Sequence, residues 1–279
     1  MNYALPLENQ QKGYVLITVL VMITAIMGLA MTMGQRALGA RTRTVYSCER
    51  IKTRHAARSG LASAFENLLL DQTPWDGPGD SWALGEAFDL TGIQVTTITR
   101  DEQARININA MIYPSGDINR LLFRAFSKLS PGKDLDAADW LSQANDRAAR
   151  YPVLPLDSSF ALNFLGLSPD HPVADEITWS GNGKINLNTA SNRVLTALGG
   201  PEFSRQVQRI REEKPIESVF DSRLTDNLLQ GLLPVVDIRS STFRIEVQAS
   251  GSLVTCHLEA LVVRQGDSVI LLQSNEWWS

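Results

Sequence analysis

The stretch that decides the fold is Tyr14-Val-Leu-Ile-Thr-Val-Leu-Val-Met-Ile-Thr-Ala-Ile-Met-Gly-Leu-Ala-Met-Thr-Met33, which lies within residues 13–35, a segment without charge. Twenty residues of helix span about 30 Å, the thickness of a bilayer core. A secretory signal has a shorter apolar region followed by a small-residue cleavage site, and neither is present here. We therefore predict one membrane-spanning helix over residues 14–34, with a buried core helix as the alternative.

Composition narrows the function classes. The chain has 279 residues, 44% of them hydrophobic and 20% charged, and its formal net charge is -4. No overall positive charge favours a nucleic-acid partner. There are two cysteines, and the three histidines show no metal-ligand spacing. Because the sequence has no Gly-rich phosphate loop, serine-elbow motif or His-Glu-x-x-His motif, we expect a protein that is not an enzyme.

The residues ahead of the apolar run indicate processing before the hydrophobic segment. Lys12-Gly13 directly precedes Tyr14. This arrangement resembles the prepilin family, in which a prepilin peptidase cuts after the Gly and N-methylates the new terminus. The resemblance implies a leader over residues 1–13 and cleavage between Gly13 and Tyr14. A plain single-span anchor is the alternative.

One position departs from the usual prepilin pattern. Most prepilins carry Glu at the fifth mature residue, where this chain has Thr18. That carboxylate meets the charged amine of a neighbouring subunit, because a lone carboxylate in an apolar fibre core is costly. A subunit without it lacks the group that docks onto a subunit ahead, which fits a place at the fibre tip. A chance Thr in a helix is the alternative.

Prepilin processing implies that the residues after the apolar helix lie outside the cytoplasm, and the distribution of charge opposes this orientation. Residues 36–58 contain seven Lys and Arg side chains against one Glu, whereas the leader has Lys12 as its one basic side chain. The positive-inside rule alone would therefore keep residues 36–58 in the cytoplasm. We give the processing motif precedence over the charge count, because the resemblance extends along the chain.

Beyond the membrane, apolar residues recur at helical spacing as far as Leu69, and breakers begin at Pro74. We expect one helix from about residue 14 to residue 71, with a stem over residues 35–71 packed on a soluble domain. The alternative is an anchor followed by a separate helix. The β-branched segment 92–99 indicates a strand within the first part of a sheet domain, residues 72–105.

The last part of the chain changes character. Residues 237–279 contain three alternating segments with turn-like Ser250-Gly251-Ser252 and Gln265-Gly266-Asp267 between them, so we predict a three-strand antiparallel meander. Trp277 and Trp278 near its end either cap one face of the sheet or contact a partner.

A weak internal repeat marks the middle of the chain. Arg105-Ile-Asn-Ile-Asn-Ala110 and Lys184-Ile-Asn-Leu-Asn-Thr189 match at an offset of 79 residues. Asn109, and Asn188 or Thr189, are candidate helix N-caps.

Residues 192–213 after the second copy resemble a helix-hairpin-helix fold, with Gly199-Gly200-Pro201 as the hairpin. In DNA-binding members of that class, hairpin N–H groups hold a phosphate. Arg205 and Arg209 favour a DNA-binding pilus-tip protein, whereas Pro201 and Glu202 favour a scaffold. The scaffold is the main interpretation and DNA binding the alternative.

Taken together, the chain resembles the K-type minor pseudopilin family of type II secretion systems. The matching segments span nearly the whole chain in order: Lys12-Gly13, Thr18, Ala57–Ser63, Asp101-Glu102 before Ile106–Asn109, Asp139-Trp140-Leu141, Gly183–Ala190 and Ser241-Thr242-Phe243.

The resemblance implies an α+β fold, with a long N-terminal helix packed on an antiparallel sheet and a large α-helical domain inserted over residues 106–236. It implies a non-enzymatic subunit at the tip of a pseudopilus, anchored once in the inner membrane with its C-terminal domain in the periplasm. Its partners would be I-type and J-type minor pseudopilins, the major pseudopilin and prepilin peptidase. A related type IV pilus fits the same residues.

Two further sites are weaker expectations. Some family members bind calcium, which takes six to eight oxygen ligands. Here the acidic residues are thinned, and the candidates are Asp134, Asp136, Asp139 and Asp157; helix caps and a solvated face are the alternative. No other cofactor is expected.

Cys48 on the stem and Cys256 on a C-terminal strand form a candidate disulfide in an oxidising periplasm, with two free thiols as the alternative.

Overall fold

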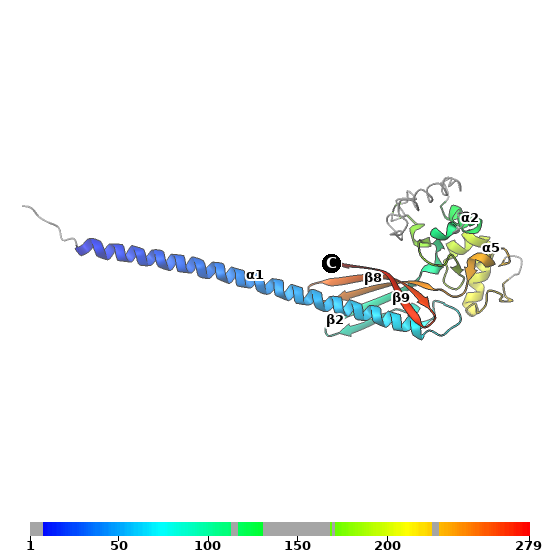
Figure 1. Cartoon of the computed structure of the whole chain (residues 1–279), viewed down its shortest axis with the longest axis horizontal. Coiled ribbons are helices and arrows are strands. Elements are labelled where there is room, and N and C mark those ends of the chain that lie inside the picture. The colour runs from blue at the N-terminus through cyan, green and yellow to red at the C-terminus, as the bar shows by residue number, and fades with distance from the viewer. Residues whose placement is uncertain (1–7, 113–116, 131–167, 169–170, 225–228) are drawn as a thin grey trace, which may run out of the picture.

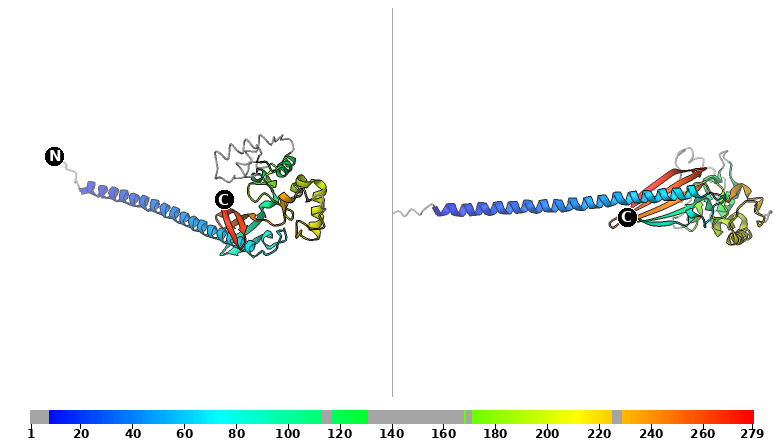
Figure 2. Two further views of the ribbon diagram at one scale, coloured as in Figure 1. Left: turned by 45° about the vertical axis from the view of Figure 1, so that its right-hand side comes forward. Right: turned by 90° about the horizontal axis from the view of Figure 1, so that it is seen from below.

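The structure is a computed structural model that describes residues 8–112, 117–130, 168, 171–224 and 229–279. The C-terminal half of a long helix packs on a sheet, and the segment inserted between two strands of that sheet lies at the end of the molecule far from the N-terminus (Figures 1 and 2). The fold predicted from the sequence is confirmed: a long N-terminal helix is followed by an antiparallel sheet.

Helix α1 (Glu8–Leu70) runs without a break from the apolar segment into the stem, as predicted. It contains no proline, and its threonine hydroxyls donate back to carbonyls one turn earlier, so they are satisfied within the helix. The helix ends at Leu70, and the side chain of the following Asp71 accepts a hydrogen bond from the Thr73 backbone N–H at 3.0 Å.

The sheet has five strands in the order β1-β2-β7-β8-β9, and every neighbouring pair is antiparallel. The strands are β1 (Glu86–Leu90), β2 (Ile93–Asp101), β7 (Thr242–Ser250), β8 (Thr255–Gln265) and β9 (Ser268–Trp278). The predicted strand 92–99 and the predicted C-terminal meander are confirmed. Strand β1 was not predicted.

Strand β1 is placed by a tight turn. Thr91 and Gly92 have φ values of 55° and 84°, so both central residues are left-handed, which suits the right-handed twist of a two-residue hairpin. The edges of the sheet are therefore β1 on one side and β9 on the other.

One core lies between α1 and the sheet. The helix contributes small buried side chains, Ala56, Ala57 and Ala64, and the larger Leu68. Opposite them are alternating residues of β2, β7 and β8, because a strand directs every second side chain to the same face.

A second core lies in the region between β2 and β7. Its described helices are α2 (Arg120–Leu129) and α5 (Asn192–Glu213), which pack on each other through side chains such as Leu122, Phe126 and Leu195. Gly200 has φ 89° and ψ 172°, so α5 consists of two helical segments that meet at the predicted hairpin.

The internal repeat has a structural counterpart. β3 (Ile106–Asn107) pairs in parallel with β4 (Ile177–Thr178), and β5 (Ile185–Asn186) pairs in parallel with β6 (Val236–Asp237). The Asn107 and Asn186 carboxamide oxygens accept from the N–H two residues later, each at 2.9 Å. The inserted region is thus built on two similar strand pairs.

The predicted N-caps are wrong. Ser191 caps α5 through a hydrogen bond from the Val194 N–H, and Asn119 caps α2. Asn188 instead bridges to Ile216, donating to its carbonyl at 3.0 Å and accepting from its N–H at 2.9 Å. Asn109 lies in a short 3-10 helix, η3 (Asn109–Met111).

Candidate functional site

The N-terminal part of α1 is exposed from Tyr14 to Cys48, and we call this segment the exposed stem. Its large apolar side chains include Leu16 at 73% and Met27 at 68% exposure. The segment is long and apolar enough to cross a membrane. Because exposed apolar area is unfavourable in water, the exposed stem needs lipid or other helices around it.

Tyr14 and Thr18, two of the predicted processing and docking residues, lie at the start of this segment. The Thr18 hydroxyl donates to the Tyr14 carbonyl at 2.6 Å and lies 3.1 Å from the Val15 carbonyl. It is therefore satisfied by its own helix and adds no charge to the apolar surface. Gly13 lies within α1 just before them.

In the basic segment 36–58, the arginines of the second half contact other parts of the molecule. The Arg54 Nε lies 2.5 Å from a Glu276 carboxylate oxygen, and Arg58 lies 4.0 Å from the same carboxylate. The guanidinium groups of Arg50 and Arg54 lie 4.5 and 5.5 Å from the centre of the Trp278 ring. The end of β9 thus packs on the arginines of the helix.

The two C-terminal tryptophans face opposite sides of the sheet. Trp278 covers α1, as expected for a residue that caps a face. Trp277 stacks on His257 of β8 at a centroid distance of 5.3 Å and is 44% exposed.

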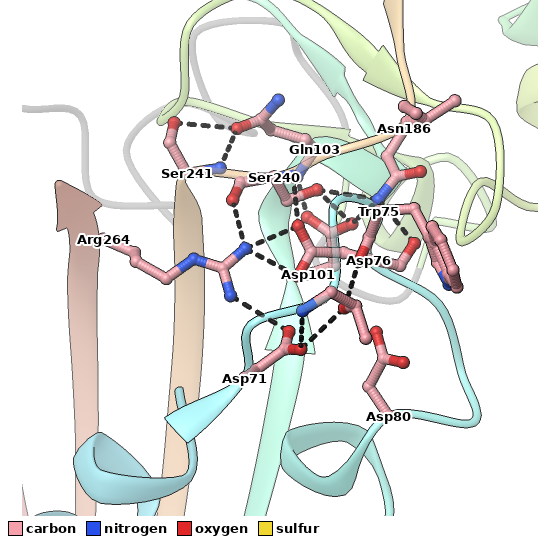
Figure 3. A network of polar contacts seen from close by, with 12 residues as sticks. Asp71, Trp75, Asp76, Asp80, Asp101, Gln103, Asn186, Ser240, Ser241 and Arg264 are labelled. Carbon is pink, nitrogen blue, oxygen red and sulfur yellow. Dashed lines mark hydrogen bonds and ion pairs between the residues drawn. The ribbon is translucent and has the colours of Figure 1, made fainter. Parts of the chain in front are cut away.

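A buried polar cluster, the junction, joins the sheet, the loop after α1 and the inserted region (Figure 3). At its centre is Arg264 on β8. Its guanidinium lies 2.6 Å from both Asp76 oxygens and 3.2 Å from an Asp71 oxygen, and donates to the Ser240 carbonyl at 3.0 Å. Burial raises the pKa of Asp76 to about 6, even though the Arg264 charge opposes that rise.

Asp101, the last residue of β2, anchors the inserted region. Its carboxylate accepts from Ser240, Thr189 and Asn186, and from the Gln103 backbone N–H at 2.7 Å. Burial raises the pKa of Asp101, and these hydrogen bonds oppose the rise only in part.

The neighbouring Glu102 points to a different set of partners, as expected for adjacent residues at a strand end. It binds Arg244 at 2.7 Å, Arg105 at 3.4 Å and the Thr178 hydroxyl. Burial would raise its pKa, but the Arg244 hydrogen bond and the two arginine charges outweigh burial, so the pKa of Glu102 is lowered. Arg244 also pairs with Glu259.

Three carboxylates of the junction, Asp71, Asp76 and Asp80, lie within 4.8 Å of one another. Arg264 binds two of them, and Asp80 accepts from the Gly77 N–H at 2.7 Å. An arginine already supplies the positive charge in this cluster. The calcium candidates Asp134, Asp136, Asp139 and Asp157 lie outside the described residues.

The helix-hairpin-helix segment places few free cations at its hairpin. Arg205 pairs with Glu202 at 2.5 Å, and Arg209 is exposed on α5. Arg211 donates to the carbonyls of Asn188 and Ala190, and burial lowers its pKa to about 10. Arg211 is therefore engaged by backbone carbonyls of the same region, and the Glu202 carboxylate places a negative charge beside the hairpin.

The candidate disulfide between Cys48 and Cys256 is not formed in this structure. Cys48 and Cys256 are free thiols, Cys48 exposed on α1 and Cys256 buried in β8 against the helix. Burial raises the pKa of Cys256 to about 11, so its thiol stays protonated at neutral pH.

Comparison with known proteins is informative at the level of structure. No family model and no curated protein matches the sequence. The fold matches a chain of the GspK-GspI-GspJ complex from the enterotoxigenic Escherichia coli type 2 secretion system, with a TM-score of 0.64 and 18% identity. The match covers 84% of this chain and 99% of that one. The fold is pseudopilin-like.

Proposed function

We propose that the protein is a K-type minor pseudopilin that occupies the tip of a type II secretion pseudopilus and initiates or caps its assembly. In this role it is not an enzyme. Its exposed stem holds it in the inner membrane after prepilin peptidase has cut between Gly13 and Tyr14. The rest of the chain lies in the periplasm, where its partners are I-type and J-type minor pseudopilins and the major pseudopilin.

The observation that carries this proposal is the exposed stem joined to a pseudopilin-like sheet. A helix with large apolar side chains on all sides serves first as a membrane anchor. The same surface packs against other such helices once the subunit enters a fibre. The structural match to a chain of a minor pseudopilin complex supports this reading.

Two features support the tip position. Thr18 brings no carboxylate for a subunit ahead. The inserted region lies at the end of the long axis far from the exposed stem, where it would obstruct addition of a subunit above it (Figure 1). Growth would then proceed from below.

The experiment that tests the proposal is N-terminal sequencing and mass measurement of the protein isolated from membranes of cells that contain a prepilin peptidase. We expect N-methylated Tyr14 at the start. Gly13→Ala should retain the leader, whereas Gly28→Ala, a matched change inside the apolar run, should be processed normally. A start at Met1, loss of the whole apolar run, or normal cleavage of Gly13→Ala would contradict the proposal.

The tip position has its own test. Thr18→Glu supplies the carboxylate that a subunit inside a fibre uses, so we expect it to permit internal placement or disturb initiation. Electron microscopy of labelled subunits and a count of fibres per cell would detect either change. Wild-type fibre numbers with the labelled subunit still at the end would contradict the argument from Thr18.

A further inference from the structure

Five arginines of α1 lie on one face of the helix. Arg36, Arg43, Arg50, Arg54 and Arg58 follow one another at spacings of seven, seven, four and four residues. At 3.6 residues per turn these positions fall within about 80° of arc and extend over about 33 Å. We call this row the arginine stripe.

The upper part of the stripe, Arg50, Arg54 and Arg58, shows which chemical groups such arginines bind. Glu276 meets Arg54 and Arg58, and the face of the Trp278 ring meets Arg50 and Arg54. A carboxylate and an aromatic ring, both from β9, therefore satisfy this half of the row.

The lower part of the stripe has no such cover. Arg36 and Arg43 lie on the exposed stem, beyond the end of β9, and no ion pair of the described residues involves them. Ala40 and Ser47 lie between the arginines on the same face. Small side chains at these positions let the backbone of a neighbouring helix approach closely.

We propose that this lower part, Arg36 to Ser47, is a docking surface for the stem helix of another pilin-like subunit that carries Asp or Glu at matching spacing. The inference rests on the proposed function, because it takes the chain as a fibre subunit. The partner's carboxylates would pair with Arg36 and Arg43 in the way that Glu276 pairs with Arg54 and Arg58.

The partner is a different chain rather than a second copy of this one. From residue 14 to residue 70, α1 carries only two carboxylates, Glu49 and Glu66. Glu49 already accepts from the Ser252 backbone N–H at 2.7 Å. The two are seventeen residues apart and lie about 100° apart around the helix, so they cannot match the stripe.

A helix explains the stripe better than a lipid surface does. A headgroup layer is only about 6 Å deep on each side, whereas Arg36 and Arg43 are about 10 Å apart along the helix axis. Lipid attraction would also not require alignment on one face. In the proposed orientation the positive-inside rule works against export of these arginines, and a specific partner gives them a use that offsets this cost.

Site-specific photocrosslinking in the full chain, in cells that express the whole fibre system, tests the proposal. A photoreactive residue at Ser47 lies on the stripe, whereas one at Val45 faces the opposite side of α1. We expect the Ser47 probe, identified by mass spectrometry of the linked peptide, to capture an acidic stretch of another subunit's stem helix. The Val45 probe should not capture it.

Charge reversal provides the matched control. Arg36→Glu/Arg43→Glu should lower capture at Ser47 by about tenfold, which corresponds to about 1.4 kcal/mol for two ion pairs. Arg41→Glu/Lys52→Glu makes the same change in net charge on the other side of the helix, and should leave capture within about twofold.

Several outcomes would overturn the docking surface: a lipid adduct at Ser47, equal losses in both double variants, or capture that is unchanged by Arg36→Glu/Arg43→Glu. The N-terminus of each variant separates this failure from failure of the proposed function. If Tyr14 is the first residue and no face-specific capture occurs, only the docking surface is wrong. If the chain is not processed at Gly13, the proposed function fails and the docking surface falls with it.

Discussion

The two halves of α1 use the same backbone for different purposes. The exposed stem presents large apolar side chains to its surroundings, among them Leu16, Ile17 and Met27. The half beneath the sheet turns small residues inward, and Ala56 and Ala57 are almost completely buried. Side-chain size therefore separates a half that packs within the molecule from a half whose large apolar side chains stay exposed.

The difference has an energetic consequence. Burial of apolar area contributes about 25 cal/mol per Å², and only the covered half of α1 gains it within this chain. We call residues 49–279 the head. Changes in the head should alter the stability of the folded chain, whereas equivalent changes in the exposed stem should leave it unaltered.

The largest effect is expected from Arg264→Met in the junction. The variant leaves Asp71 and Asp76 without their cation, and Asp76 is fully buried. Removal of one partner of a buried ion pair costs about 3–5 kcal/mol. Urea unfolding in detergent, followed by tryptophan fluorescence, measures the head alone, because all six tryptophans lie after residue 70.

Arg43→Met in the exposed stem is the control and should leave the unfolding curve unchanged. Arg264→Met/Asp76→Asn should recover part of the loss, because both charges are then removed and Asn retains an acceptor for the Ser240 N–H. A loss below about 1 kcal/mol in Arg264→Met would contradict a structural role for the pair.

A smaller effect is expected at Gly60, where α1 meets the sheet. A Cβ there would lie 2.8 Å from methyl groups of both Val95 and Val247 and 3.0 Å from Thr97. Gly60→Ala should therefore cost about 1–3 kcal/mol through overpacking, despite the better helix propensity of Ala.

Gly39→Ala is the same substitution in the exposed stem, where nothing lies within 4 Å of the new methyl group. It should cost nothing and should raise helix content slightly, as measured by circular dichroism. Equal losses in the two variants would mean that the exposed stem belongs to the cooperative unit of the head, and the contrast between the two halves would be wrong.

The elements that the sequence predicted well are those with long periodic signals. An uncharged run of over twenty residues and the absence of proline between Pro6 and Pro74 were enough to predict α1. Alternation over about nine residues predicted β2 and β7. Strand β1 has only five residues, and its clearest signal was the Thr91-Gly92 turn that follows it.

The junction could not be predicted, because long-range pairing creates it. Arg264 and Asp76 are 188 positions apart, and Asp76 lies in a loop rich in Pro and Gly. Arg264 directly follows an apolar alternating segment, where it reads as a solvated strand end. No local pattern separates such a residue from an exposed arginine.

The wrong N-caps have a similar cause. Asn188 and Thr189 are good cap residues, but tertiary contacts engage both: Asn188 with Ile216 and Thr189 with Asp101. The Ser191 hydroxyl also makes a tertiary contact, donating to Glu176, but its oxygen still accepts from the Val194 N–H and so caps α5. Local propensity identified the start of the helix to within a few residues and left the choice among neighbouring caps to packing.

The last prediction concerns the change of stability with pH, and it compares two carboxylates whose pKa is lowered, one inside the head and one at the boundary with the exposed stem. The pKa of Glu102 lies below its usual 4.5 in spite of burial, because Arg244 and Arg105 favour the charged form. A lowered pKa stabilises the folded state above pH 4.5, and this contribution is lost as the pH falls through the folded value.

Glu102→Gln should therefore cost about 2 kcal/mol at pH 7, where Arg244 keeps Glu259 as its remaining partner. The deficit should shrink below pH 4.5, because Glu102 of the wild-type protein then begins to take up a proton in the unfolded state. Urea unfolding of both proteins between pH 3 and pH 7 measures this change. A deficit that stays constant over this range would mean that shape, and not charge, is what Glu102 contributes.

Glu49→Gln provides the contrast. Hydrogen bonds from Ser252 lower the pKa of Glu49 in the same direction, but its carboxylate is open to solvent. Water and salt screen such a group, so its pH dependence should be weaker than that of Glu102 and should diminish further in high salt. If Glu49→Gln altered stability as strongly as Glu102→Gln, the head would have to extend along α1 past the turn that Glu49 contacts, and the boundary of the exposed stem would move toward the N-terminus.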